Sequence, residues 1–338
     1  MYMDHYGLSA PPFQLTPDSR FYFDSRTHKK AMAYLGFGLS QGEGFIVVTG
    51  DIGAGKTTLV EHLMATIDRS RLTAIRLSTT QVEGDDLLRL TAQGLGIPTQ
   101  GAPKALLLGQ VEDSLHQHAQ QGKRVLLVVD EAQNLPTSAL EELRMLSNFQ
   151  AGERQLLQIF LLGQPEFRDR LMGDSELEQL RQRVIATHHL DAMSADEIGP
   201  YIEHRLKLAG ASGRPTFGED AYDALYRQSG GVPRRLNTLA NRVLLQGSIE
   251  GSDAIGGDLV DTVAAEIALD SAPRETPKAR RGKAAAGTLD ASLARIAALE
   301  ARLEGHEAIL RRVLTLMVDW VEGDRHAGSR THAHDDAA

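Results

Sequence analysis

The sequence from Phe45 to Thr58 reads Phe-Ile-Val-Val-Thr-Gly-Asp-Ile-Gly-Ala-Gly-Lys-Thr-Thr. Its first part, Phe45–Thr49, is an apolar run rich in β-branched residues, which predicts a buried strand. Gly50–Thr57 fit the pattern G-x-x-x-x-G-K-T, and residues 59–67 have the character of a helix. Because a strand precedes the glycine-rich turn and a helix follows it, the structural context that this motif requires is present. The stretch therefore predicts a P-loop that binds a nucleoside triphosphate.

The residues of this loop suit the phosphates in different ways. Its glycines let the backbone turn tightly, so that successive N–H groups point at phosphate oxygens. The helix that begins near Gly55 adds the positive end of its dipole. Lys56 can reach the β- and γ-phosphates, and the Thr57 hydroxyl can ligate Mg²⁺. The expected nucleotide contacts of the loop are Gly50, Asp51, Ile52, Gly53, Ala54, Gly55, Lys56, Thr57 and Thr58.

A second motif ends the apolar run Arg124–Glu131, which has the pattern of a strand covered on both faces. A carboxylate at the C-terminal end of a parallel strand lies beside the P-loop, where Mg²⁺ is held. Asp130 is therefore predicted to be the acid on the metal side, acting through a water. Glu131 is predicted to orient and activate the attacking water, which indicates hydrolysis. The alternative is that both acids only stabilise the start of a following helix.

Three polar residues farther along the chain are weaker candidates. Gln164 follows the apolar run Leu156–Leu162, where its side chain could touch the γ-phosphate or the water, although such a glutamine is usually a turn residue. Arg181 and Arg183 lie two residues apart on a helical segment and point in different directions, so at most one serves a given site. From spacing alone, both arginines are surface charges.

Composition and periodicity divide the chain into six segments. They are an N-terminal arm and helix at residues 1–44 that pack on the nucleotide site, a P-loop core at 45–190, a helical second domain at 191–269, a flexible linker at 270–288, an amphipathic or coiled-coil helix at 289–322 and a disordered tail at 323–338. Strands of the core are expected at residues 45–49, 73–77, 124–131, 156–162 and 184–190.

Two of these segments allow more than one interpretation. The arm is dense in prolines and aromatic residues, which indicates an ordered, extended segment held by its rings. It either packs on the core or also covers the adenine base. Residues 289–321 place apolar side chains at alternating spacings of four and three, interrupted by Glu300 and Glu307. That helix buries its apolar stripe either on a second copy or on a partner protein.

The composition sets broad limits on the chain. Its 338 residues include no cysteine, which excludes disulfides, thiolate metal sites and a cysteine nucleophile. The N-terminus does not have the character of a signal peptide, and no apolar run approaches the about 18 residues of a membrane span. We therefore expect a cytoplasmic protein without a transmembrane segment. The net charge of −9 argues mildly against a protein whose main task is to coat DNA.

Taken together, these motifs resemble the AAA+ ATPases. Within that class they resemble the family of the general secretion pathway A component, and most closely its relatives encoded with exosortase and PEP-CTERM exopolysaccharide loci. The resemblance covers roughly residues 1–268 and extends beyond the P-loop and the acid pair. It is carried by Tyr6-Gly7-Leu8, Pro12-Phe13, Leu15-Thr16-Pro17-Asp18, His28, Leu162-Gly163-Gln164-Pro165 and Gly231-Val232-Pro233-Arg234-Arg235-Leu236-Asn237.

The resemblance implies a fold and several residue roles. The fold is an α/β P-loop NTPase with an ASCE-type parallel sheet of strand order 5-1-4-3-2 and a helical lid formed by the second domain. Gln164 becomes a sensor-1 residue, and Arg234 becomes a sensor-2 residue that contacts the nucleotide from the lid. Arg183, with Arg181 as second choice, becomes an arginine finger that reaches the γ-phosphate of a neighbouring subunit.

The chain also departs from this family. Members that serve type II secretion carry a membrane span and a peptidoglycan-binding module after the ATPase, and neither is expected here. The soluble exopolysaccharide-associated branch is therefore the better fit. We expect a homo-oligomeric ATPase that uses ATP and Mg²⁺ and acts on a protein partner at the inner membrane through the C-terminal helix. The alternatives are a DNA-associated regulator, such as a transposition helper or initiator-like protein, and a nucleotide switch with little turnover.

Overall fold

The computed structural model describes residues 2–16, 18–78 and 82–271, and residues 1–272 form one compact unit. The segments expected at 289–322 and 323–338, and nearly all of the linker expected at 270–288, lie outside the described residues. No helix within the described ranges is long and apolar enough to cross a lipid bilayer.

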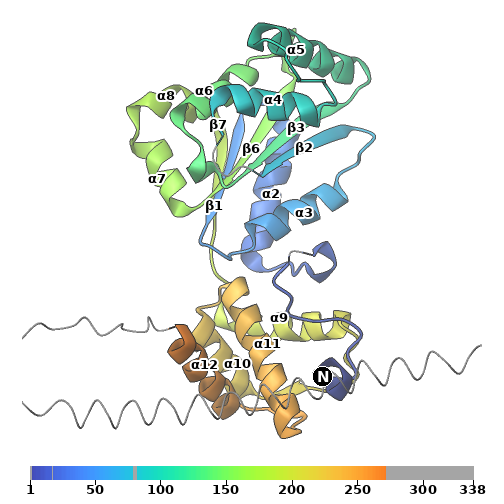
Figure 1. The fold of residues 1–338 in the computed structure, drawn as a ribbon, viewed down its shortest axis with the longest axis vertical. Helices are drawn as coiled ribbons and strands as arrows, with labels where there is room; N and C mark the ends of the chain where they lie inside the picture. The colour runs from blue at the N-terminus through green and yellow to red at the C-terminus, as the bar shows by residue number, and fades with distance from the viewer. Residues whose placement is uncertain (1, 17, 79–81, 272–338) are drawn as a thin grey trace, which may run out of the picture. The chain divides into compact units, whose positions relative to one another are not determined.

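A five-stranded parallel sheet forms the centre of the core (Figure 1). Its strands are β1 (Phe45–Gly50), β2 (Leu72–Ser78), β3 (Arg124–Asp130), β6 (Leu157–Gly163) and β7 (Val184–Leu190). Their order across the sheet is β2-β3-β6-β1-β7. Numbered in chain order, these strands run 2-3-4-1-5. The predicted order 5-1-4-3-2 is therefore confirmed, read from the opposite edge.

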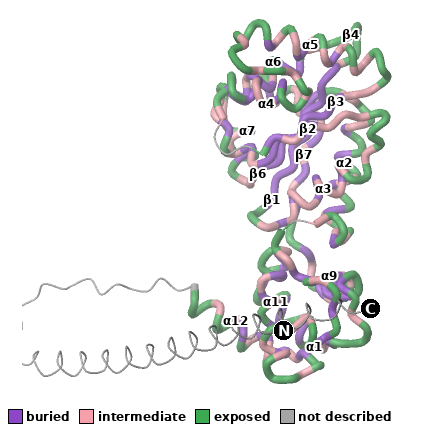
Figure 2. Tube along the Cα trace, turned by 45° about the vertical axis from the view of Figure 1, so that its right-hand side comes forward, coloured by how far each residue is buried: buried purple, intermediate pink, exposed green. Residues whose placement is uncertain are grey.

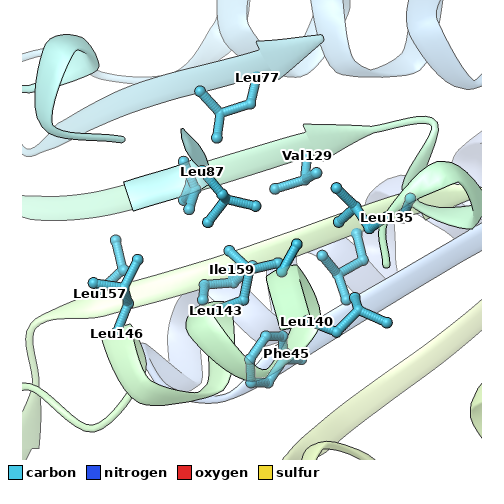
Figure 3. Packing of buried hydrophobic residues seen from close by; sticks show 14 of the residues in the cluster. Phe45, Leu77, Leu87, Val129, Leu135, Leu140, Leu143, Leu146, Leu157 and Ile159 are labelled. Atoms are coloured by element: carbon cyan, nitrogen blue, oxygen red, sulfur yellow. The ribbon is translucent and has the colours of Figure 1, made fainter. Parts of the chain in front are cut away.

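Helices cover both faces of this sheet because successive side chains of a strand point to opposite faces. Phe45 and Val47 of β1 face one hydrophobic cluster, which Figure 3 shows from close by, and Ile46 and Val48 face another. The first cluster includes residues of α4 (Gly84–Gly94), α5 (Lys104–Gln120), α6 (Thr137–Leu146), α7 (Pro165–Gly173) and α8 (Glu178–Arg181). The second includes residues of α2 (Arg26–Gln41) and α3 (Lys56–Thr66). The three central strands, β1, β3 and β6, are consequently buried along almost their whole length, whereas the edge strands β2 and β7 are partly exposed (Figure 2).

The helical lid follows the last strand. It consists of α9 (Ala195–Leu208), α10 (Glu219–Ser229), α11 (Pro233–Glu250) and α12 (Gly257–Ser271), with a short parallel pair formed by β8 (Thr216–Phe217) and β9 (Ala254–Ile255). Helix α9 begins with a capping box. The Ser194 hydroxyl and backbone N–H both lie within hydrogen-bond distance of the Glu197 carboxylate. Such a cap fixes the start of a helix and contributes about 1 kcal/mol.

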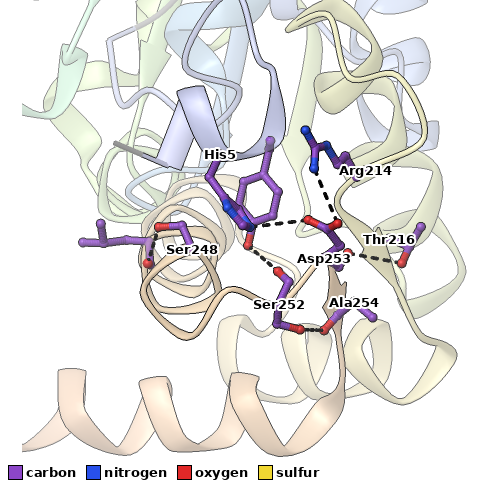
Figure 4. A network of polar contacts seen from close by, with 9 residues as sticks. His5, Arg214, Thr216, Ser248, Ser252, Asp253 and Ala254 are labelled. Carbon is purple, nitrogen blue, oxygen red and sulfur yellow. Dashed lines mark hydrogen bonds and ion pairs between the residues drawn. The ribbon is translucent and has the colours of Figure 1, made fainter.

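The N-terminal arm packs into the hydrophobic cluster of the lid. Tyr6, Phe13 and Phe21 are buried there, so the aromatic rings hold the arm as expected, but on the lid rather than on the P-loop core. The arm is not extended throughout, because it begins with α1 (Tyr2–Tyr6) and contains a 3-10 turn, η1 (Ser19–Phe21). Figure 4 shows how α1 is attached: His5 lies 3.4 Å from the Asp253 carboxylate, and the Tyr6 hydroxyl donates to the Ser252 carbonyl at 3.1 Å.

The structure also contains elements that the periodicity of the sequence did not indicate. Besides α6 and α7, these are the 3-10 turns η2 (Ala132–Asn134) and η3 (Ser175–Leu177) and the antiparallel hairpin of β4 (Gln150–Ala151) and β5 (Arg154–Gln155). The helical segment that was expected to carry both Arg181 and Arg183 ends before Arg183, since η3 and α8 together end at Arg181.

Candidate nucleotide-binding site

The P-loop connects β1 to α3 through a backbone that only glycine tolerates at two positions. Gly53 and Gly55 have φ values of +87° and +99°. A Cβ on Gly53 would lie 2.4 Å from the Arg234 Cβ, and one on Gly55 would lie 2.8 Å from Nε2 of His28. The loop is therefore closely packed by the lid on one side and by α2 on the other.

The Lys56 ammonium points back into this loop. Its Nζ donates to the carbonyl oxygens of Gly50 at 2.5 Å and Asp51 at 3.0 Å. Burial lowers the pKa of Lys56, and the nearby Glu131 and Asp130 carboxylates oppose that effect. A buried cation held mainly by neutral carbonyls is well placed to exchange them for the oxygens of a phosphate.

The Thr57 hydroxyl and the Asp130 carboxylate lie side by side at the start of α3 and the end of β3. The hydroxyl donates to Oδ2 of Asp130 at 3.2 Å, and Nη2 of Arg76 lies 3.2 Å from the same oxygen. Within the described ranges, no group of three or more His, Cys, Asp or Glu residues could hold a metal ion. The pair nevertheless fits Mg²⁺, which prefers hard oxygen ligands and usually completes its coordination with phosphate and water.

The Glu131 carboxylate is held by two glutamine side chains. Nε2 of Gln133 donates to Oε2 of Glu131 at 2.5 Å, and Nε2 of Gln164 lies 3.5 Å from the same oxygen. Oε1 of Gln133 also accepts from the backbone N–H of Gln164 at 3.1 Å. Gln133 thus connects the end of β3 to the end of β6. Sequence reasoning missed Gln133, although its position two residues after the acid pair was a usable signal.

A cleft of about 310 Å³ joins the loop to the lid. Of the predicted site residues, it brings together Ile52, Gly53, Gly55, Lys56, Thr57, Thr58, Glu131, Gln164 and Arg234. Gly50 and Asp51 accept hydrogen bonds from Lys56, and Asp130 accepts one from Thr57; both donors line the cleft. Ala54 is buried in the core. The Arg234 backbone N–H, in the first turn of α11, donates to the Gly53 carbonyl at 3.2 Å.

The arm and the lid supply the rest of the cleft lining. Phe21, Tyr22 and Phe23 come from the arm, and Tyr201 and Arg205 come from α9. The ring of Phe23 meets that of Tyr201 edge-on, with centroids 5.4 Å apart. Apart from the suggestion that the arm covers the base, sequence reasoning did not find this wall. Its two parts, one from the arm and one from α9, are more than 170 residues apart in the chain, so no local pattern connects them.

His28 joins α2 to the P-loop. Its Nδ1 lies 2.7 Å from the Ser25 hydroxyl, and its ring meets that of Tyr22 edge-on. Burial lowers the pKa of His28 to about 4, against the weaker opposing attraction of Asp24 and Glu197. The imidazole is therefore neutral at physiological pH.

The structure places Arg181 and Arg183 far from their own P-loop. Val184 pairs with Phe45 at the start of β1, whereas Leu190 pairs with Gly50 at its end, so the length of a strand, about 20 Å, separates them. Nη1 of Arg183 donates to the Ser147 hydroxyl at 2.9 Å, and Nη1 of Arg181 donates to the Met172 carbonyl at 2.9 Å. Neither guanidinium can serve the site of its own chain.

Comparison with known proteins agrees with this geometry. Residues 39–171 match the family described as an AAA domain. Over 268 residues the chain is 35% identical to general secretion pathway protein A of Aeromonas hydrophila, a match that covers 79% of this chain and 48% of that protein. The chain thus spans about half the length of the curated relative that it matches.

Similar folds occur among origin-recognition proteins. Cdc6p from Pyrobaculum aerophilum superposes with a TM-score of 0.58 at 15% identity, covering 78% of this chain and 74% of that one. Drosophila ORC bound to DNA gives 0.54 at 16% identity, covering 81% and 68%. The Aeropyrum pernix ORC2 protein in its ADPNP-ADP complexes gives 0.53 at 17% identity, covering 71% and 66%. Identities this low show the fold alone.

A parallel α/β P-loop core that carries a helical lid defines an AAA+ protein. Within that class the chain belongs to the family of general secretion pathway protein A.

Proposed function

We propose that the chain binds ATP together with Mg²⁺ and hydrolyses it to ADP and phosphate. The observation that best supports hydrolysis is the oriented carboxylate of Glu131. It lines the cleft with Lys56 and Gln164, and Gln133 donates a hydrogen bond to it. A site that only retained a nucleotide would not need a carboxylate held beside the phosphates.

The other residues have roles that follow from their atoms. The loop N–H groups and Lys56 bind the β- and γ-phosphates, and Arg234 approaches them from the lid. Thr57 and Asp130 would hold Mg²⁺, which when bound neutralises charge on the phosphate oxygens. Glu131 orients the attacking water and accepts its proton, while the Gln164 amide donates to the γ-phosphate or to that water.

The variant Glu131→Gln tests this proposal because it keeps the shape of the side chain and removes the base. We expect ATP turnover to fall by about 10²- to 10⁴-fold, while the affinity for ATP, measured by calorimetry, is unchanged. Glu153→Gln, at an exposed position in the β4–β5 hairpin, is the matched control and should leave both quantities unchanged. Turnover unaffected by Glu131→Gln would remove Glu131 from its role.

Two alternatives predict different results. A nucleotide switch would bind ATP with little turnover in the wild-type chain. A DNA-associated regulator would be retained on duplex DNA at physiological ionic strength, and the likeness of the fold to DNA-bound Drosophila ORC is the observation behind that alternative. The net charge of −9 argues against it, because phosphate neutralisation dominates affinity for DNA. The absence of salt-dependent retention would exclude it.

We further propose that copies of the chain assemble head to tail into a homo-oligomer. Arg183, or Arg181 as second choice, lies at the end of the strands that is far from its own P-loop, so it would serve the nucleotide of a neighbouring copy. A heterologous contact of this kind places an arginine finger of one subunit at the site of the next.

The proposed biological role is supported by the similarity to general secretion pathway protein A rather than by the geometry of the site. General secretion pathway protein A is named for secretion. Our chain would therefore power or regulate a partner in envelope secretion or in exopolysaccharide export. It would act from the cytoplasmic side of the inner membrane, and the segment at residues 289–322 would dock on that partner. Retention of the partner by the full chain, and its loss on deletion of residues 289–322, would test this role.

A further inference from the structure

Arg205 in the lid helix α9 is a buried cation with unused donors. The residue is only 6% exposed, and its Nε and Nη1 atoms have no hydrogen-bond partner among the described residues. The same part of the chain offers it no ion pair. Asp18 attracts Arg205 through space, but the Asp18 carboxylate accepts hydrogen bonds from Arg20 at 2.7 Å and from Gln14 at 3.0 Å.

This arrangement is unfavourable for the free protein. Unpaired donors on a buried charged group cost free energy because the group has lost its water. The guanidinium carbon lies 5.3 Å from the ring centroids of Phe21 and Tyr201, and cation–π attraction offsets part of that cost. Burial lowers the pKa of Arg205, yet an arginine keeps its proton in proteins, so the charge remains. A group with such a cost is typical of a binding site.

Arg205 lines the same cleft as Lys56 and Arg234. Arg205 lies on α9, on the side of the cleft that carries the aromatic rings. The groups that suit the γ-phosphate, Glu131 and Gln164, come from the ends of β3 and β6. A nucleotide with its phosphates on the P-loop must direct its base toward the part of the cleft that the loop does not form. That part carries aromatic rings and the Arg205 guanidinium.

We propose that Arg205 is a base-reading residue, whose guanidinium donates to acceptor atoms on the base of the bound nucleotide. This inference rests on the nucleotide site proposed above. A guanidinium has donors only, so it selects acceptors. Purines present N7 in the imidazole ring, and pyrimidines have no such ring. A contact to N7 therefore favours a purine over a pyrimidine, and by itself it discriminates little between adenine and guanine.

Binding measurements on the full chain separate the base from the phosphates. The ligands are ATP, CTP, inorganic tripolyphosphate and the 7-deaza and 3-deaza analogues of ATP, and the variant is Arg205→Met. We expect Arg205→Met to weaken ATP about ten- to a hundredfold, the range for a hydrogen bond to a charged group, and to leave tripolyphosphate unchanged. Arg242→Met is the matched control, because Arg242 is exposed on α11 and pairs with Asp270.

The deaza analogues test the hydrogen bond itself. The wild-type chain should bind at least one of them more weakly than ATP, and Arg205→Met should bind both as it binds ATP. If Arg205→Met weakened tripolyphosphate as much as ATP, or if both analogues bound the wild-type chain as ATP does, the inference would be overturned. A wild-type chain that binds ATP and shows this pattern without turnover would contradict the proposed hydrolysis and leave the base contact standing.

Thermal unfolding without nucleotide excludes a purely structural role. Replacing an unpaired buried cation by an apolar side chain of similar length is often neutral or stabilising. We therefore expect the Tm of Arg205→Met to equal or exceed that of Arg242→Met. A Tm clearly below the control, together with weaker tripolyphosphate binding, would show that Arg205 supports the lid rather than the base.

Discussion

Glu131 is held in a backbone conformation that few residues with a side chain adopt. Its φ of 56° and ψ of 41° lie in the left-handed region, and no other non-glycine residue in the described ranges has a positive φ. Such a conformation costs about 1–3 kcal/mol. It turns the chain from β3 into η2, which brings Gln133 back to the Glu131 carboxylate. The strained backbone and this hydrogen bond therefore form one local arrangement.

Gln133→Leu tests whether that arrangement positions the carboxylate. The change removes the donor to Glu131 and the acceptor of the Gln164 N–H, so we expect kcat to fall roughly tenfold or more, because a hydrogen bond to a charged group contributes about 1.5–3 kcal/mol. KM for ATP should not change, because Gln133 does not bind the phosphates. Steady-state kinetics beside Gln93→Leu, at an exposed position on α4, measure both. A rise in KM with kcat unchanged would contradict a positioning role.

At the scale of elements, the P-loop and the first turn of α11 pack on each other at Gly53. A Cβ there would clash with the Arg234 Cβ, and the φ of +87° disfavours any side chain. We expect Gly53→Ala to separate the loop from the lid and to weaken ATP binding by tenfold or more, since strain of about 1–3 kcal/mol must be relieved. Calorimetry with ATP measures this loss.

Gly109→Ala is the control for Gly53→Ala. Gly109 lies in α5, and an added Cβ there would meet nothing within 4 Å. Alanine in a helix interior is about 1 kcal/mol more favourable than glycine, so this variant should raise Tm and leave ATP binding unchanged. Equal ATP affinity of the two variants would show that the loop has room at Gly53.

The elements that sequence reasoning predicted best are those whose signal is local. The five strands and the P-loop turn each follow from contiguous residues, and β7 has the predicted bounds of 184–190. Helix α1 could not be predicted in this way. Five residues are too short for a stable helix in isolation, so α1 depends on its packing against the lid.

The residues of the site can be divided in the same way, into those with a local sequence signal and those without one. Lys56, Thr57, Asp130 and Glu131 lie next to strand ends that are visible in the sequence, and the structure gathers them as expected. Arg205 could not be identified from the sequence, because its proposed role depends on the lack of hydrogen-bond partners for its guanidinium in the folded chain. Only the folded chain shows that Phe21 and Tyr201 bury the guanidinium without pairing its nitrogens. The spacing of residues likewise did not predict the hydrogen bonds of Arg181 and Arg183 to Met172 and Ser147.

For the whole molecule, His28 links stability to pH. The unfolded chain has an ordinary histidine pKa near 6.5, and the folded chain has about 4. Above pH 6.5 the imidazole is neutral in both states and contributes nothing. As the pH falls from 6.5 toward 4, the unfolded chain binds a proton that the folded chain does not bind, so stability decreases. The difference corresponds to roughly 3 kcal/mol at most.

Urea unfolding between pH 7 and pH 4 measures this effect through a comparison with His28→Gln. We expect the free energy of unfolding of the wild-type chain to fall more steeply with decreasing pH than that of His28→Gln, because the variant has no imidazole to protonate at this position. His116→Gln, on α5, should keep the wild-type slope. Parallel curves for the wild-type chain and His28→Gln would show that His28 is not kept neutral by its burial.

An arginine finger supplied by a neighbouring copy, as proposed above, would make turnover a property of the assembly. We expect Arg183→Ala to lower turnover by about 10³-fold or more without changing ATP affinity, whereas Arg154→Ala, on the exposed hairpin, should change neither. Each variant alone should then be inactive. Arg183→Ala removes the finger that one subunit supplies, and Glu131→Gln removes the base that its neighbour supplies. In a mixture, an Arg183→Ala subunit supplies an intact Glu131, and a Glu131→Gln neighbour supplies an intact Arg183.

Equal amounts of the two variants should therefore recover about a quarter of the wild-type rate, since random head-to-tail assembly pairs the two intact halves at one site in four. The recovered rate should rise with protein concentration, because a shared site would exist only in the assembly. The same mixture with Arg181→Ala in place of Arg183→Ala identifies which arginine crosses the interface. If neither mixture regained activity while the wild-type chain hydrolysed ATP at every dilution, each subunit would contain a complete site, and no finger would be supplied by a neighbour.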